Sequence, residues 1–310
     1  MAHFVTKIGY AISHLYKSLC KTPHPRLVMT LLVKNEEQML AYNIEYHHRM
    51  GVDAFIITDN NSTDHTPDII KHYVEKGWVI EHIHEPATNY EQKEWVDRMI
   101  WLAKTKHHAD WVINADADEF WHTSKGNLKE EIKQTHANVL SCEMRSVYPT
   151  PDKEWTDWIY TVRYVDTPDK YDLSPYSVFE HQNKKVIHRT AGYIQISMGN
   201  HKVKMLPQNE IKSNIIVYHY NFRTCQHFMS KMINGGKQLE QHKGKHGGRH
   251  WRYYYALYKK DPLLLKAEYQ RAIGANSFVR LQHDGFIYKD NPMPEFFKAL
   301  KKEVTDFPIF

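Results

Sequence analysis

The stretch WVINADADEFW, residues 111–121, decides the fold that this sequence predicts. It begins as an apolar run and ends with Asp116, Asp118 and Glu119, three acidic residues within four positions. A buried parallel strand has this pattern when its last residues emerge at the carboxyl edge of a sheet. Residues two apart in extended chain point the same way, so Asp116 and Asp118 are expected to project to one side.

Two neighbouring carboxylates repel each other unless a cation lies between them, and hard oxygen ligands favour Mg²⁺ or Mn²⁺. The alternative is a solvated acidic turn after a strand. Phe120 and Trp121 argue against that alternative, because an exposed turn rarely carries such apolar bulk. A D-x-D pattern is weak by itself, so its value depends on the segments that precede it.

Strands and helices alternate through the first 120 residues. Apolar runs predict buried strands at residues 27–33, 54–58, 78–83 and 111–114. Helical patterns fill the intervals, from residue 34 to about 50, from about 64 to 77, and from about 91 to 106. This alternation indicates an α/β fold with an open, mostly parallel sheet flanked by helices. Ligands of such sheets bind at the carboxyl ends of the strands, where the polar clusters at 34–37, 59–64 and 116–119 all fall.

The order of these polar clusters resembles a known family. Lys34-Asn35-Glu36, then Asp59-Asn60-Asn61-Ser62-Thr63-Asp64, then Asp116-Ala117-Asp118-Glu119-Phe120 resemble the family-2-type glycosyltransferases of the GT-A (nucleotide-diphospho-sugar transferase) fold. Later segments resemble a bacterial branch linked to lipopolysaccharide or capsule assembly. They are Lys185-Val186-Ile187-His188-Arg189, Gly199-Asn200-His201, and His219-Tyr220 with Phe222-Arg223-Thr224, Lys231 and Gly235-Gly236. The match covers roughly residues 27–255.

The resemblance implies a nucleotide-sugar donor, with a UDP-sugar favoured, and Mn²⁺ or Mg²⁺ as cofactor. It implies that Asp118 ligates the metal and that Asp116 contacts the ribose, or the metal through water. Glu119 orients this pair or, equally well, caps the next turn. Asp59 is the expected contact to the nucleotide base, with Asn35 and Glu36 lining the same pocket. The alternative for Asp59 is a turn residue that bonds its own backbone.

Five further residues are candidates for the same site. Gln92 and Lys93 begin the helix before the acidic strand, where they are expected to meet phosphate or ribose, or else to be a solvated helix end. His201, in a loop after the strand at residues 193–198, is a third metal ligand or a base. Arg223 is a candidate diphosphate clamp because its guanidinium fork fits phosphate oxygens. His219 is the second choice among the histidines.

The acceptor hydroxyl of an inverting reaction needs a catalytic base. The sequence offers five carboxylates without distinguishing among them: Glu143, Asp152, Asp157, Asp172 and Glu180. The resemblance favours inversion over retention. The acceptor expected from it is a saccharide or a glycolipid.

Composition narrows the class of protein. The 310 residues carry a net charge of +5, with 22 histidines besides, which fits an anionic ligand or an anionic membrane surface. The basic residues are too evenly spread for a nucleic-acid interface. No run approaches the ~18 apolar residues of a membrane span, and no signal-peptide core follows the start. Three scattered cysteines favour the reducing cytoplasm.

The sequence predicts three regions: an amphipathic helix within residues 1–22, a catalytic domain at 23–205, and a mostly helical acceptor-side region at 206–310. Residues 235–252 combine glycines with basic residues, which predicts either a mobile lid or acceptor clamp over an anionic ligand, or a solvated basic loop between helices. Aromatic and basic residues alternate after residue 250. Together with the N-terminal helix they favour peripheral association with the inner face of the cytoplasmic membrane. The alternatives are that the N-terminal helix docks on the domain, as most amphipathic helices do, and that the aromatic residues serve ordinary helix packing.

The prediction is thus a metal-dependent glycosyltransferase. One rival is a nucleotidyltransferase or metal phosphohydrolase that uses the same acidic edge. A second is a non-catalytic protein that binds membranes or polyanions, and a nucleic-acid binder is the least favoured.

Overall fold

The structure is a computed structural model that describes residues 22–87, 91–165, 179, 183–221, 223–241, 248–273 and 275–305. The predicted N-terminal helix and two of the base candidates, Asp172 and Glu180, lie outside these residues. The chain divides into two compact units, each made of separate stretches. Unit 1 comprises Met1–Met144, Asn183–Val217 and Leu300–Phe310, and unit 2 comprises Arg145–Gln182 and Tyr218–Ala299.

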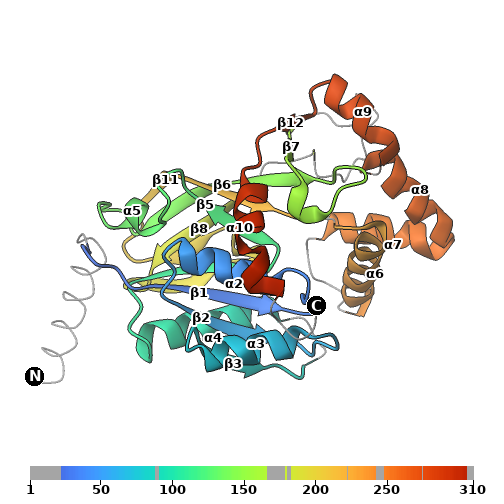
Figure 1. Cartoon of the computed structure of the whole chain (residues 1–310). Helices are drawn as coiled ribbons and strands as arrows, with labels where there is room; N and C mark the ends of the chain where they lie inside the picture. The colour runs from blue at the N-terminus through green and yellow to red at the C-terminus, as the bar shows by residue number, and fades with distance from the viewer. Residues whose placement is uncertain are drawn as a thin grey trace, which may run out of the picture. The chain divides into compact units, whose positions relative to one another are not determined.

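A sheet with four parallel strands forms the centre of unit 1 (Figure 1). These strands are β1 (Leu27–Val33), β2 (Ala54–Asp59), β3 (Val79–His84) and β4 (Trp111–Ala115), in the order β3-β2-β1-β4. Two antiparallel strands extend the sheet beyond β4, first β8 (Lys184–Arg189) and then β6 (Val139–Tyr148). The four predicted strands are confirmed, and each predicted end lies within one residue of the observed end.

Three helices connect the parallel strands: α2 (Leu40–Arg49), α3 (Thr66–Glu75) and α4 (Gln92–Thr105). The apolar face of α4, with Met99 and Ile100, packs in one buried cluster with Val28, Ile56 and Val112 of the sheet. Burial of this face holds α4 against the strands, because each fully buried aliphatic side chain contributes about 1.5–3 kcal/mol. The predicted α/β class, with parallel strands joined by helices, is confirmed.

Shorter elements complete unit 1. They are β5 (Glu119–His122), α5 (Lys129–Ile132), β9 (Tyr193–Ile196), the 3₁₀ turn η3 (Met198–Asn200), β10 (Val203–Met205) and most of β11 (Glu210–His219). β9 pairs with β10, and β11 pairs with β5 and β6. No helix within the described residues is long and apolar enough to cross a membrane.

Unit 2 is mostly helical. It holds η1 (Trp155–Asp157), β7 (Tyr160–Val162), α6 (Cys225–Gln241), α7 (Arg249–Lys260), α8 (Pro262–Ala272), α9 (Ala275–His283), β12 (Ile287–Lys289) and the start of α10 (Met293–Thr305). β12 pairs antiparallel with β7. Aromatic residues of α6, α7 and α8 share one buried cluster, in which Phe228 contacts Tyr254 and Tyr269.

The lid interpretation was wrong for residues 235–241. Gly235 and Gly236 lie inside α6, where an added Cβ would come within 2.4 Å of the Trp251 ring and 2.2 Å of the Tyr255 side chain on α7. The two glycines therefore allow a close helix contact rather than loop motion. Residues 242–247 of the predicted lid lie outside the described part of the chain.

Candidate functional site

Strand register brings the three polar clusters to one edge of the unit 1 sheet. Val33, the last residue of β1, lies opposite Asp59, the last residue of β2. Leu31 lies opposite Ala115, the last residue of β4, so the acidic loop that begins at Asp116 leaves the sheet beside the end of β1. The carboxyl ends of neighbouring parallel strands coincide here, as the sequence predicts.

Hydrogen bonds lock the first two clusters together. The Ser62 hydroxyl donates to Asp59 Oδ1 at 2.6 Å and accepts the backbone N–H of Asn35 at 2.9 Å. Asn35 Oδ1 in turn accepts the backbone N–H of Thr63 at 2.8 Å. Asp59 also accepts the N–H of Ser62 at 3.1 Å, so one of its oxygens closes its own turn. Asn35 and Asp59 therefore have a structural role, because they hold the loops after β1 and β2 together.

Glu36 belongs to the same interlock. Its backbone N–H donates to the Thr66 hydroxyl at 2.8 Å, at the start of α3. The next residue, Glu37, donates its N–H to Asp64 at 3.2 Å and accepts the N–H of His65 at 3.0 Å. These bonds fix the loop between β1 and α2 against the N-terminus of α3.

Two side chains of α2 hold the backbone of the acidic loop. Asn43 is fully buried, and its amide nitrogen donates to the carbonyl oxygens of Ala117 and Glu119, each at 2.9 Å. One turn later, His47 Nε2 accepts the backbone N–H of Trp121 at 2.9 Å. Residues four apart lie on one face of a helix, so a single face of α2 fixes the loop from 117 to 121.

His47 performs this role as a neutral ring. Its Nδ1 contacts the carbonyl oxygen of Asn43 at 2.8 Å, and a carbonyl can only accept, so Nδ1 carries the proton and Nε2 the lone pair. Burial lowers the pKa of His47 to about 3, although the bond to the Asn43 carbonyl opposes this change. The ring therefore stays neutral throughout the physiological range.

A buried lysine from β8 lies among the carboxylates of the acidic loop. Lys185 Nζ is 2.6 Å from Glu119 Oε1 and 3.2 Å from Asp116 Oδ2. The side chains of Lys185 and Glu119 are 2% and 0% exposed, whereas Asp116 is 37% exposed. Burial alone would lower the pKa of Lys185, but the charges of Asp116 and Glu119 outweigh it and raise that pKa, so the amine is an ammonium.

The Glu119 carboxylate contacts the backbone of the acidic loop and Lys185 of β8. Its Oε2 accepts the backbone N–H of Asp116 at 3.3 Å, while its Oε1 faces Lys185. Asp118, which lies between Asp116 and Glu119 in the sequence, is 4% exposed. The loop thus has one partly exposed carboxylate, Asp116, and two buried ones.

The rest of β8 anchors the site to the sheet. Asn114 of β4 accepts from the Thr30 hydroxyl at 2.7 Å and donates to His188 Nε2 at 3.0 Å, which forms a buried polar chain across β1, β4 and β8. Burial lowers the pKa of His188 to about 4. Arg189, also buried, places its guanidinium 4.7 Å from the centre of the Trp111 ring.

The helix α4 fixes the turn that carries His201. Gln92 Oε1 accepts the N–H of Gly199 at 3.1 Å, and His201 Nδ1 donates to the carbonyl oxygen of Lys184 at 2.8 Å. Nδ1 therefore carries the proton, and Nε2 is the basic nitrogen of the neutral ring. Gly199 has a φ of 74°, and a Cβ there would lie 2.8 Å from the His201 ring. Lys93 forms a surface ion pair with Asp97 at 3.0 Å.

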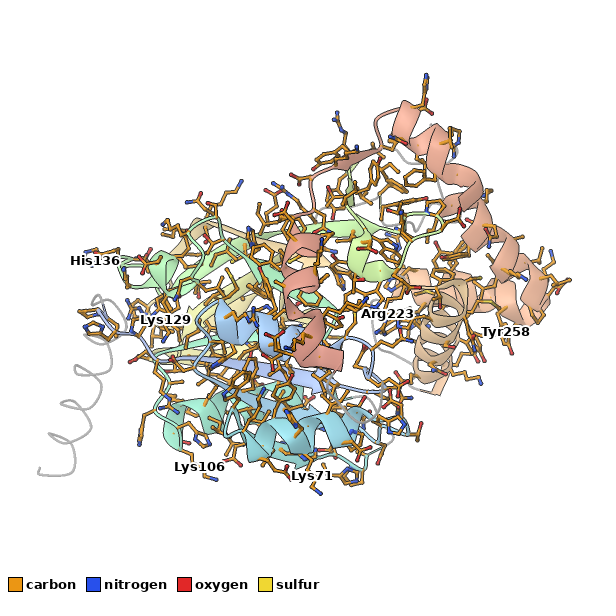
Figure 2. All side chains as sticks on the ribbon, viewed as in Figure 1. Lys71, Lys106, Lys129, His136, Arg223 and Tyr258 are labelled. Atoms are coloured by element: carbon orange, nitrogen blue, oxygen red, sulfur yellow. The ribbon has the colours of Figure 1, made fainter. Side chains whose placement is uncertain are left out.

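No group of three or more His, Cys, Asp or Glu side chains with a geometry that would hold a metal ion is formed among the residues that the structure describes. Asp116, Asp118 and His201 therefore do not make a ready-made cage. Arg223 and His219 belong to unit 2. There Arg223, labelled in Figure 2, is buried just before α6. Its guanidinium donates to His227 Nε2 at 2.8 Å.

Three residues of this arrangement were given no role in the site by the sequence prediction: Asn43, His47 and Lys185, although Lys185 begins one of the segments that carry the family resemblance. A signal is present for the two residues of α2. Asn43 and His47 stand four apart on the buried face of α2, whereas Lys185 follows another lysine at the start of β8 and has no such signal. Polar groups at buried positions need partners, so Asn43 and His47 each point to a specific contact.

A known family matches most of this chain. The model of a family described as Glycosyltransferase family 92 matches residues 28–261. A glycosyltransferase family 92 protein of Ricinus communis is 27% identical over 125 residues, which are 40% of this chain and 22% of that protein. The lipopolysaccharide core biosynthesis glycosyltransferase LpsC of Rhizobium meliloti is 26% identical over 181 residues, 57% of each protein. This chain thus spans less than two thirds of either relative.

Two solved structures align over most of the chain at low similarity. One is the mannosyltransferase PcManGT of Pyrobaculum calidifontis in complex with GDP-Man and Mn²⁺, with a TM-score of 0.43, 12% identity, and 99% and 90% of the two chains covered. The other is GalNAc-T7 with UDP, GalNAc and Mn²⁺, with a TM-score of 0.41, 9% identity, and 92% and 58% covered.

Proposed function

The chain belongs to glycosyltransferase family 92, and from that premise we propose that it transfers a sugar from a nucleotide-diphospho-sugar to a saccharide acceptor. The resemblance to glycosyltransferases found in the sequence is confirmed at this level, with family 92 as the family shown. The observation that carries the proposal is the convergence of the loops after β1, β2 and β4, with the acidic loop among them. A UDP-sugar is the proposed donor.

Asp116, Asp118 and His201 are the proposed ligands of a Mn²⁺ or Mg²⁺ ion. These residues fit an ion that the protein shares with the donor, because Mg²⁺ and similar ions are commonly held by one or two carboxylates together with substrate phosphates. Asp116 is the carboxylate open to solvent, and the protonated Nδ1 of His201 leaves Nε2 as its ligating nitrogen. When bound, the ion would stabilise the departing diphosphate as a Lewis acid.

The residues of this chain then have the tasks of binding and orientation. We assign the nucleotide base to Asp59 Oδ2, with Asn35 and Glu36 beside it, since Oδ1 of Asp59 is used in its own turn. Gln92 supports the turn of His201. Lys93 remains a candidate for phosphate binding, although its present partner is Asp97. Arg223 remains one on the chemistry of its guanidinium.

The proposed acceptor is the saccharide of a surface glycolipid, such as the core of a lipopolysaccharide. The relative LpsC is named for lipopolysaccharide core biosynthesis, and this supports the choice. A base for the acceptor hydroxyl is still required. Of the five carboxylates considered, Glu143, Asp152 and Asp157 lie in the described residues, and the choice among them and an inverting outcome remain proposals.

The test is the release of nucleoside diphosphate from a panel of UDP- and GDP-sugars with Mn²⁺. Asp118→Ala should lower the rate by at least about a hundredfold, because electrostatic stabilisation of this kind is worth that much in comparable sites. Asp68→Ala is the matched control, since this aspartate on α3 has a 68% exposed side chain. Formation of pyrophosphate or nucleoside monophosphate would support the nucleotidyltransferase or phosphohydrolase instead. Unchanged ligand binding and turnover in Asp118→Ala would favour the non-catalytic rival.

A further inference from the structure

The acidic loop carries three carboxylates, and the side chain of Lys185 contacts two of them. Lys185 reaches them from β8, where antiparallel pairing places Ile187 opposite Ile113 of β4. Continuing this register by two residues sets Lys185 beside the end of β4, immediately before Asp116. The strand pairing therefore delivers the ammonium to the loop.

The contacts of Lys185 divide it between a buried acid and a partly exposed one. Glu119 is 2.6 Å away and fully buried, so this pair is shielded from water and fixed. Asp116 is 3.2 Å away, and its side chain is 37% exposed, so water or a dissolved ion can replace Lys185 as its partner. An ammonium and a divalent ion at Asp116 Oδ2 would compete for the same oxygen.

The charges at the loop determine how strongly this competition changes the affinity for a divalent ion. Asp116, Asp118 and Glu119 together contribute three negative charges when ionised, and Lys185 reduces the net charge to −2. Unit charges a few ångströms apart interact strongly in a partly buried site. The affinity of the loop for a free divalent ion must therefore depend on whether the ammonium is present.

We propose that Lys185 is a positioning residue that holds Asp116 and weakens the binding of a free divalent ion, so that the ion binds together with the diphosphate of the donor. This inference rests on the proposed function and deepens it. The phosphates add negative charge at the edge and so offset the ammonium. Lys185 thereby couples the binding of ion and nucleotide, and such coupling is reciprocal.

The test compares Glu119→Gln with the double variant Glu119→Gln/Lys185→Met. Both have a neutral residue at position 119, so neither leaves a buried carboxylate there without a cation, and the two differ only in the ammonium. Binding of Mn²⁺ alone is measured by the electron paramagnetic resonance signal of the unbound ion, and again with UDP. We expect Mn²⁺ alone to bind the double variant about tenfold or more tightly than Glu119→Gln, with a smaller additional gain from UDP.

Lys185→Arg is the charge-conserving control and should bind Mn²⁺ as the unchanged protein does. Cooperative thermal unfolding verifies that each variant is folded. Equal affinity of the single and the double variant for Mn²⁺ would overturn the inference, and so would a weaker affinity of the double variant. Absence of Mn²⁺ and UDP binding in the unchanged protein would instead count against the proposed function, so the two failures are distinguishable.

Discussion

Asn43 is a single residue on which the shape of the acidic loop depends. Replacing it with alanine leaves the buried carbonyls of Ala117 and Glu119 without the donor that each now has. We expect Asn43→Ala to lower the free energy of unfolding by about 2–4 kcal/mol, because each buried unsatisfied group costs about 1–3 kcal/mol. Urea denaturation measures the loss. Gln38→Ala, at an exposed position before α2, should change the stability by less than about 0.5 kcal/mol.

Two buried histidines give the stability of the fold a pH dependence. The pKa values of His47 and His188 fall from 6.5 to about 3 and about 4 on folding. Below pH 6.5 the unfolded chain therefore binds protons that the folded chain does not. The stabilisation is complete above pH 6.5 and is lost as the pH falls toward 4, by up to about 1.4 kcal/mol per pH unit for each histidine.

The same effect can be assigned to one ring by substitution. His188→Gln should flatten the dependence of the unfolding free energy on pH between 6.5 and 4.5 by about one proton. His283→Gln, which changes an 86% exposed ring, should leave the slope unchanged. Urea denaturation at several pH values measures both variants. Parallel curves for His188→Gln and the unchanged protein would contradict the assignment.

The contact between α6 and α7 depends on the absence of two side chains. Alanine favours a helix over glycine by about 1 kcal/mol, yet a Cβ at Gly235 or Gly236 would lie 2.4 or 2.2 Å from atoms of α7. Overpacking costs about 1–3 kcal/mol, and here the nearest atoms belong to an aromatic ring and a Cβ, which cannot easily move. We therefore expect Gly235→Ala and Gly236→Ala to be destabilising, as measured by thermal unfolding.

Asn234→Ala is the control for the glycine variants, since it raises the helix propensity of α6 at a neighbouring exposed position. It should leave stability unchanged or raise it slightly. A gain of stability in Gly236→Ala would show that the helices can separate without cost.

At the scale of the whole molecule, the net charge of +5 favours an anionic surface. On α8, Leu263 and Leu264 are 69% and 37% exposed, and they follow Lys259 and Lys260 at the end of α7. We expect sedimentation with vesicles that contain phosphatidylserine, and a loss of binding as salt rises. Leu263→Ser/Leu264→Ser should weaken binding several-fold, whereas Val279→Ser, at another exposed apolar position, should not. Equal binding to neutral vesicles would contradict the prediction.

The sequence predicts the four strands between residues 27 and 115 well because local pattern and tertiary role agree there. The strand ending at Ala115 is apolar and buried, and the acidic residues begin where pairing stops. The pattern failed at Gly235, where a glycine pair that usually marks a loop serves helix packing. It also gave no role to Lys185, because the acidic partners of this lysine lie 69 and 66 residues earlier in the chain. Contacts over such separations come from the fold and have no local signal.

The position of Lys185 on β8 also has a consequence for how the chain avoids misassembly. A slip of this strand by one residue would reverse the face of every side chain in it. The ammonium would then enter the apolar layer under α4, and Val186 would face the carboxylates in its stead. Such an arrangement leaves uncompensated charge on both sides of the sheet, so alternative alignments of β8 are disfavoured by the same lysine that serves the acidic loop.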